Sequence, residues 1–318
     1  MKERNMNMFT LSRRKFLALA GISGAATLSG FSTLAAMKGN LKRLTILHTN
    51  DTHSRLDPYP PNDPNFPNMG GYARRAALVN YLRLEDPELL LLDAGDYFQG
   101  TPYFNLFGGE AELKLMSQMG YDAATVGNHE FDNGLVGFHN VHHHASFPFV
   151  VSNYDFSDTI LKDVTKPYLV LEKNGLKVGI YGLGITLRGL VAPSNFEGLK
   201  YLDPVEVART TEETLKNRHR CQVIICLSHL GFNYNHDRPS DVLVAKETSY
   251  TDIIIGGHTH TLLDPPVKEK NKLNREVTIG QTGSGGVRLG MMEVLFDLNS
   301  GEKLVEASTT KIYKNQGA

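Results

Sequence analysis

The stretch Leu89-Leu90-Leu91-Leu92-Asp93-Ala94-Gly95-Asp96 runs from four leucines directly into two aspartates. A short run that is apolar throughout is typical of a strand buried on both faces of a parallel sheet. Polar residues directly after such a strand lie at its carboxyl end, where open α/β sheets bind ligands. This stretch therefore predicts an α/β fold with a chemically active sheet edge.

The same arrangement recurs at four other predicted strands, each followed by Asp, His or Asn. Residues 44–48 lead into Asp51-Thr52-His53, 123–126 into Gly127-Asn128-His129-Glu130-Phe131-Asp132, 223–227 into Ser228-His229, and 253–255 into Gly256-Gly257-His258-Thr259-His260. Taken singly, each polar residue is more often a turn former than a ligand. Five such strand ends together indicate one metal site, because they carry the nitrogen and oxygen donors that divalent metals accept.

The number of candidate ligands indicates more than one ion. Two Asp, one Asn and four His exceed what a single tetrahedral or octahedral site uses comfortably. They suit two ions that share a bridging carboxylate. The candidates are Asp51, His53, Asp96, Asn128, His229, His258 and His260.

Helical patterns alternate with these strands, which is typical of an α/β layered domain. We expect helices over 72–84, 111–119, 135–144 and, capped by Asp203-Pro204, as far as about residue 219. The second half shifts towards antiparallel structure, with hairpins predicted at 168–181 and 287–313. No repeat divides the chain, so we expect one catalytic domain over residues 38–318.

The composition limits the classes of function that the chain can have. The chain has 318 residues, a net charge of −1 and 41% hydrophobic residues, as in ordinary globular proteins. No broad basic field is present for a nucleic acid polymer. Cys221 and Cys226 lie in a predicted buried strand, where residues five apart face opposite sides. We expect both to be core residues without a disulfide or thiolate metal site.

The first 37 residues differ from the rest. They begin with basic residues, and an apolar stretch follows over 17–36. Ser12-Arg13-Arg14-Lys15-Phe16-Leu17 resembles a twin-arginine export signal, with small residues at Ala35 and Ala36 for cleavage. We expect residues 1–37 to be a signal peptide and the mature protein to be periplasmic or extracellular. The alternative is a single membrane anchor.

The ordered motifs resemble those of a known family. Asp51-Thr52-His53, Gly95-Asp96, Gly127-Asn128-His129-Glu130, His229 and Gly257-His258-Thr259-His260 resemble the motif blocks of the calcineurin-like metallophosphoesterases. The longer stretches 47–51, 93–102, 128–132 and 281–283 resemble the 5′-nucleotidase branch of that family. The resemblance implies a four-layer αββα sandwich with mixed sheets and metals at the sheet edges.

The resemblance also implies residue roles. It assigns one metal to Asp51, His53 and His260, and the other to Asn128, His229 and His258. Asp96 would bridge the two ions, and a hydroxide held between them would attack the phosphate. His129 would be the general acid at the leaving group, with Asp132 orienting it. The ligand set suits Zn, Mn, Fe or Co.

The resulting prediction is an exported, two-metal hydrolase of phosphate monoesters, with 5′-nucleotides as the expected substrates. One alternative is a phosphodiesterase for cyclic nucleotides or another small phosphorylated molecule. Bacterial members of this branch usually add a second, substrate-binding domain, whereas the sequence ends at Ala318. A second alternative is therefore a metal-binding subunit that needs a separately encoded substrate-binding partner.

Overall fold

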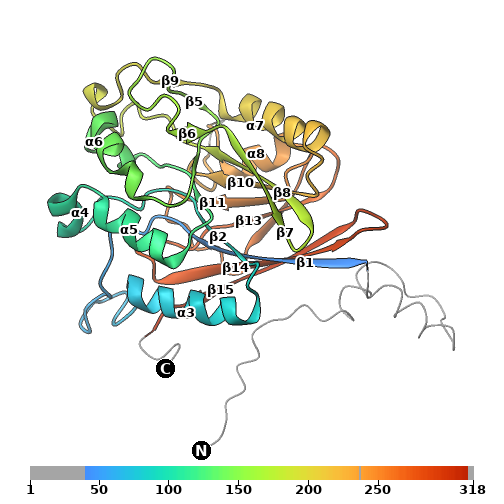
Figure 1. The fold of residues 1–318 in the computed structure, drawn as a ribbon, viewed down its shortest axis with the longest axis horizontal. Helices are drawn as coiled ribbons and strands as arrows, with labels where there is room; N and C mark the ends of the chain where they lie inside the picture. Colours follow the sequence, from blue (N-terminus) through green and yellow to red (C-terminus); the bar gives the residue numbers. More distant parts are fainter. Residues whose placement is uncertain (1–39, 236–237, 314–318) are drawn as a thin grey trace, which may run out of the picture.

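The structure is a computed structural model that describes residues 40–235 and 238–313 (Figure 1). The predicted signal peptide at 1–37 lies outside the described residues. Among the helices in the described part of the chain, none is long and apolar enough to cross a membrane.

The first sheet has seven strands in the order β15-β14-β1-β2-β3-β4-β6. Their bounds are β1 (Leu41–Thr49), β2 (Leu90–Asp93), β3 (Ala123–Ala124), β4 (Phe149–Val150), β6 (Thr165–Lys166), β14 (Arg288–Asp297) and β15 (Lys303–Lys311). Strands β1, β2, β3, β4 and β6 are parallel to one another, and β14 and β15 join at one side as an antiparallel pair. The carboxyl ends of β1, β2 and β3 therefore meet at one edge.

The second sheet has six strands in the order β12-β13-β11-β10-β8-β7. Their bounds are β7 (Tyr168–Lys173), β8 (Leu176–Leu183), β10 (Val223–Ser228), β11 (Ile253–Gly256), β12 (Val267–Lys270) and β13 (Glu276–Gly280). The four central strands are parallel, and only β7 and β12 at the edges are antiparallel. The predicted shift to antiparallel structure is therefore right for both hairpins and wrong for the centre of this sheet. A separate two-stranded ribbon pairs β5 (Tyr154–Asp155) with β9 (Lys200–Tyr201).

Six α-helices cover the sheets within the described residues. They are α3 (Tyr72–Glu85), α4 (Pro102–Phe107), α5 (Glu110–Met119), α6 (Gly134–Val141), α7 (Pro204–Glu213) and α8 (Asp241–Glu247). Local signals place the start of α7 and the end of α5 as predicted. The Asp203 carboxylate accepts the backbone N–H groups of Val205 and Glu206 at the start of α7. Gly120, with φ 72°, ends α5.

Three apolar cores separate four layers. The first core joins β2 residues such as Leu91 to α3, α5 and α6, and the second lies between the two sheets. The third joins the second sheet to α7 and α8 through residues such as Ile254 and Val244. Figure 1 shows α3 on one side of the sheets and α7 and α8 on the other. The αββα sandwich is confirmed, and Leu91 and Leu92 face different cores, which explains why this strand is apolar throughout.

The prediction that both cysteines are core residues is confirmed, and the prediction that they face opposite sides of a strand is wrong. Both thiols are free and buried. Strand β10 begins only at Val223, so the alternation of a strand does not apply to Cys221. Cys221 and Cys226 consequently lie in the same core, between the second sheet and its helices.

His48 is the buried titratable group of the interface between the sheets. It is 1% exposed, and its Nδ1 has no hydrogen-bond partner in the described structure. A Cβ on Gly290, opposite His48 on β14, would stand only 2.1 Å from its Nε2. Burial in this tight space lowers the pKa of His48 to about 4.

This burial predicts a pH-dependent loss of stability. Between pH 6.5 and 4 the unfolded chain binds a proton at His48 and the folded chain does not, so the free energy of unfolding falls as pH falls. The contribution of His48 is about 3 kcal/mol over this window. Urea denaturation at several pH values should show a shallower decline for His48→Leu than for the wild type. The same replacement at exposed His143 is the control; an unchanged slope for His48→Leu would contradict the prediction.

Candidate metal centre

All nine predicted site residues are brought to one edge of the sandwich. They lie on the segments that follow β1, β2, β3, β10 and β11. Seven of them form three overlapping groups whose ligand atoms lie within 4.8 Å of one another. Asn128 and Asp132 contact members of these groups directly. The groups consist of Asp51, His53 and His260; of His53, Asp96 and His129; and of Asp96, His229 and His258.

The first group lies nearer the surface. The Nε2 atoms of His53 and His260 are 2.9 Å apart, and the Nε2 of His260 is 3.4 Å from Oδ1 of Asp51. Asp51 itself is fully buried and accepts the backbone N–H of His258. Two imidazole nitrogens and a buried carboxylate thus face a common point, which suits a divalent cation.

The second group is built around His229, which is fully buried. Its Nδ1–H donates to the Ala94 carbonyl at 2.7 Å, so its Nε2 points into the group. That Nε2 comes within 3.0 Å of Asp96 Oδ2 but has no aligned hydrogen-bond partner among the described residues. Asn128 Oδ1 lies 3.0 Å from Nδ1 of His258, the third member of this group. A buried nitrogen and a carboxylate oxygen that converge in this way fit two ligands aimed at one cation.

The electrostatics of the second group agree with this arrangement. Burial lowers the pKa of His229, but the adjacent Asp96 carboxylate outweighs burial and raises that pKa to about 10. Burial and the neighbouring His229 lower the pKa of His258 to about 4. The buried carboxylates of this group therefore favour a positive charge beside them. A cation at this place would supply that charge.

The backbone at these positions is strained. Asp51, His53, Asp96, His258 and His260 have φ values of 48°, 48°, 57°, 70° and 52°. Residues with a Cβ rarely adopt this left-handed region, and such strain gathers at functional sites. The chain also packs so closely here that position 127 requires a glycine. A Cβ on Gly127 would stand 2.2 Å from Asp96 Oδ1 and 2.6 Å from His229 Nε2.

His129 and Asp132 form the predicted pair at the mouth of the site. The Nδ1 of His129 lies 2.7 Å from Oδ2 of Asp132, and their side chains are 31% and 27% exposed. Burial lowers the pKa of His129, but the bond to Asp132 and the charge of Asp96 raise it to about 9. The bond to Asp132 thus favours the protonated imidazole and orients the His129 ring at the mouth of the site.

Glu130 is a positioning residue that the sequence prediction did not single out. It is 1% exposed, and its carboxylate accepts the backbone N–H groups of Asp96 at 2.9 Å, Phe98 at 3.1 Å and Gly127 at 2.5 Å. Burial, with Asp96 nearby, raises its pKa to about 8. Glu130 thus ties the loop after β2 to the loop after β3, and its place inside the Asn-His-Glu motif was the available signal.

Asn50 and Gln281 hold the remaining loops. The Asn50 amide donates to Asp51 Oδ2 and to the Gly283 carbonyl, and its oxygen accepts from Thr282. Gln281 donates to the Gly257 carbonyl and accepts from the backbone N–H of Thr261. Gln281 thus fixes the segment that carries His258 and His260, and Asn50 ties Thr282 and Gly283 to the loop of Asp51.

The three bonds to Glu130 generate a prediction. Glu130→Ala leaves three buried N–H groups without an acceptor, which should lower the free energy of unfolding by roughly 3 kcal/mol and weaken metal binding. Glu130→Gln keeps one acceptor oxygen and should lose less. Urea denaturation and metal titration measure both effects, with exposed Glu88→Ala as the control. A Glu130→Ala variant as stable as Glu88→Ala would contradict this role.

Comparisons with known proteins agree with the geometry. Residues 44–262 match the family model described as calcineurin-like phosphoesterase. The chain is 36% identical over 293 residues to the trifunctional nucleotide phosphoesterase protein of Bacillus subtilis, covering 82% of this chain and 18% of that protein. It is 35% identical to the snake venom 5′-nucleotidase of Gloydius brevicauda, covering 80% of this chain and 45% of that protein.

A solved structure shows the same likeness. The 5′-nucleotidase precursor from Thermus thermophilus superimposes with a TM-score of 0.76 at 34% identity, covering 85% of this chain and 54% of that chain. The chain thus spans about half or less of the length of these relatives. The matched region includes every residue of the candidate centre. The chain belongs to the calcineurin-like phosphoesterase family.

Proposed function

We propose that the chain is a two-metal phosphoesterase that hydrolyses the phosphate monoester of 5′-nucleotides. The observation that carries the proposal is that Asp96 belongs both to a group with His53 and to a group with His229. One ion would be held by Asp51, His53 and His260, the other by Asn128, His229 and His258. Asp96 would bridge them.

Each residue of the mouth has a role in the proposed reaction. Divalent ions bound here would neutralise the phosphoryl charge and activate a water molecule. His129 would give a proton to the departing oxygen of the ester, and its bond to Asp132 favours the protonated imidazole. Asp132 would hold the imidazole in the required orientation through its 2.7 Å contact with Nδ1.

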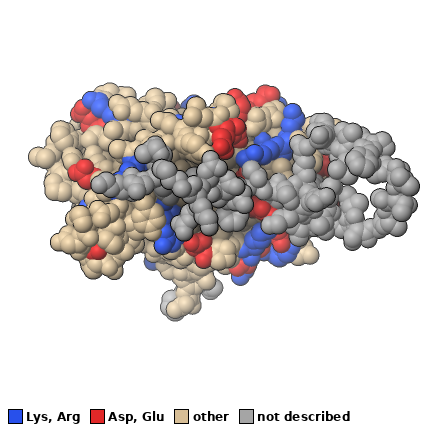
Figure 2. Space-filling view, turned by 90° about the horizontal axis from the view of Figure 1, so that it is seen from below, with Lys and Arg blue, Asp and Glu red and all other residues tan. Residues whose placement is uncertain are grey.

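Nucleotides are the proposed substrates because relatives that match about four fifths of this chain are named as nucleotidases or nucleotide phosphoesterases. Figure 2 shows acidic and basic side chains interspersed on one face of the molecule. The purified chain should release phosphate from nucleoside 5′-monophosphates in the presence of Zn, Mn, Fe or Co. If the purified chain by itself hydrolyses none of them, the result would favour a phosphodiesterase or a requirement for a separately encoded substrate-binding partner.

Two variants separate metal binding from proton transfer. Asp96→Ala should lose bound metal and activity together, because a bridging carboxylate serves both ions. His129→Ala should keep its metal and turn over about 10²–10⁴-fold more slowly, as for loss of a general acid. Elemental analysis and steady-state kinetics measure the two effects, and His143→Ala is the control. Full metal content in Asp96→Ala would refute the bridge, and full activity in His129→Ala would refute the acid.

We also propose export through the twin-arginine route. The support is the segment Ser12–Leu17 together with relatives named as a venom enzyme and as a precursor. In a bacterium with a twin-arginine translocase, the double variant Arg13→Lys, Arg14→Lys should accumulate uncleaved in the cytoplasm, with Arg4→Lys as the control. Immunoblots of periplasmic and cytoplasmic fractions measure this. Normal export of the double variant would exclude the route.

A further inference from the structure

Two buried carboxylates lie beside the metal centre without belonging to it. Asp241 and Glu112 are both 0% exposed, and neither is a member of the three ligand groups. Asp241 is the first residue of α8, which packs against the second sheet, and Glu112 lies in the first turn of α5, which packs against the first sheet. The two side chains therefore approach the loops of the centre from opposite layers of the sandwich.

Asp241 is bonded to the segment that carries His229. Its Oδ1 accepts the hydroxyl hydrogen of Ser228 at 2.5 Å, and Ser228 Oγ in turn accepts the backbone N–H of Leu230 at 3.3 Å. Its Oδ2 faces the end of β11, because a Cβ on Gly256 would stand 2.1 Å from that oxygen. Since Ser228 and Leu230 flank His229, the Asp241 pair, which is Asp241 with Ser228, fixes the backbone on both sides of this candidate ligand.

Glu112 is bonded in the same way beside His53. Ser54, the next residue, is 0% exposed and donates its hydroxyl hydrogen to Oε1 of Glu112, while Thr101 Oγ1 donates to the Ser54 carbonyl at 2.8 Å. The φ of Ser54 is 53°, in a region that residues with a Cβ rarely adopt. The Glu112 pair, which is Glu112 with Ser54, thus stabilises a strained backbone directly after this candidate ligand.

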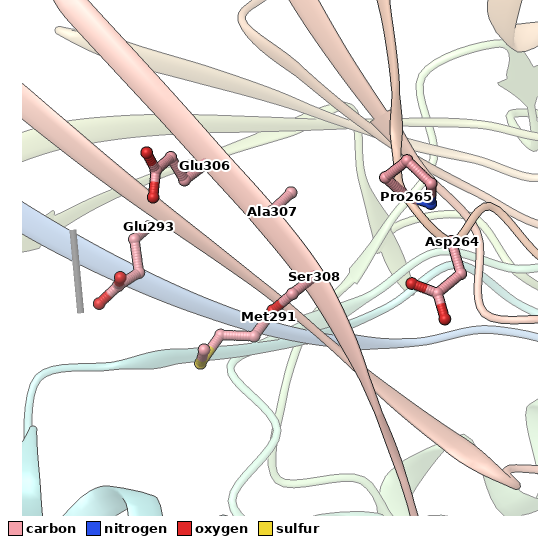
Figure 3. Close-up of a pocket in the computed structure, with 7 residues that line it drawn as sticks. All are labelled: Asp264, Pro265, Met291, Glu293, Glu306, Ala307 and Ser308. Carbon is pink, nitrogen blue, oxygen red and sulfur yellow. The ribbon is translucent and has the colours of Figure 1, made fainter. Parts of the chain in front are cut away.

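Both carboxylates are costly to bury. Burial raises the pKa of each, that of Asp241 to about 8. Oδ2 of Asp241 and Oε2 of Glu112 have no hydrogen-bond partner among residues 40–235 and 238–313. By contrast, Glu293 and Asp264, which line the hollow in Figure 3, each form an ion pair with an arginine. A buried carboxylate with an unpartnered oxygen destabilises the fold, so two of them beside one centre indicate function rather than packing.

Resting on the proposed function, we propose that these two serine–carboxylate pairs are positioning devices, one for each metal ion. The Asp241 pair holds His229 in the orientation that one ion requires, and the Glu112 pair holds His53 for the other. A ligand that is already oriented loses less conformational freedom when the ion binds, so each pair raises the affinity for its own ion. Asp241 and Glu112 act through the serines and do not themselves coordinate a metal.

Two Kd values, one for each ion, test the inference. Crystals of the full chain are equilibrated with a series of Mn²⁺ concentrations, and the anomalous peak height at each metal position is plotted against concentration. The measured quantity is the ratio of the Kd of the ion at His229 to the Kd of the ion at His53. General destabilisation cannot move this ratio in opposite directions, whereas two separate positioning devices must do so.

Opposite shifts are expected from the two pairs. Asp241→Ala and Ser228→Ala should raise the ratio about tenfold, and Glu112→Ala and Ser54→Gly should lower it about tenfold. The serine variants remove the donor instead of the acceptor, so they keep the test valid if a carboxylate variant does not fold. Asp241→Asn and Glu112→Gln retain an oxygen that can accept the serine hydrogen, and they should leave the ratio within about twofold of the wild type.

Glu212→Ala is the matched control. Glu212 is 1% exposed and accepts the backbone N–H groups of Ser249, Tyr250 and Thr251, so its loss should destabilise the fold without moving the ratio.

Three results would overturn the inference. They are a ratio that is unchanged in the four variants that remove a bond, a shift in the same direction in all four, and an equal shift in the two conservative variants. Fewer than two metal peaks in the wild type would refute the proposed two-metal function itself. Two wild-type peaks with an unchanged ratio in the variants would refute only the positioning role of the two pairs.

Discussion

The structure depends on one electrostatic constraint, the burial of two carboxylates beside one histidine. Asp51 is fully buried and Asp96 is 2% exposed, and both approach Nε2 of His229, which is fully buried as well. Buried charge is costly unless it is compensated. Burial lowers the pKa of His229, but the Asp96 carboxylate outweighs burial and raises it to about 10, so a positive charge is favoured here. Divalent cations would balance the buried negative charge, so this edge of the sandwich is suited to hold them.

The layers explain how a chain can maintain such a centre. The central strands of both sheets are parallel, and three apolar cores hold the sheets and helices in fixed positions. Loops that leave these strands can therefore adopt strained backbones, as at Asp51 and His258, because the cores on either side stabilise them. Glu130 and Asn50 then join one loop to the next. The proposed catalytic acid, His129, lies on one of these loops with its side chain 31% exposed, so a substrate can reach it.

The sequence predicted much of this because the relevant signals are local. Apolar runs that end in Asp, His or Asn located the strands, and the fold brings those ends together. Other features depend on tertiary contacts that no pattern encodes. The start of β10 at Val223, which changes the face of Cys221, is set by pairing with β8. The roles of Glu130 and Gln281 follow from distant backbone groups that they bond. The bond between Ser54 and Glu112 joins residues that are 58 positions apart in the chain.

The most direct test of this account is an anomalous-scattering map of crystals of the full chain grown with Mn²⁺ or Zn²⁺. The account predicts two metal peaks, one among Asp51, His53 and His260 and the other among Asn128, His229 and His258. A carboxylate oxygen of Asp96 should lie within bonding distance of both peaks. A single peak, or two peaks of which Asp96 reaches only one, would contradict the central claim.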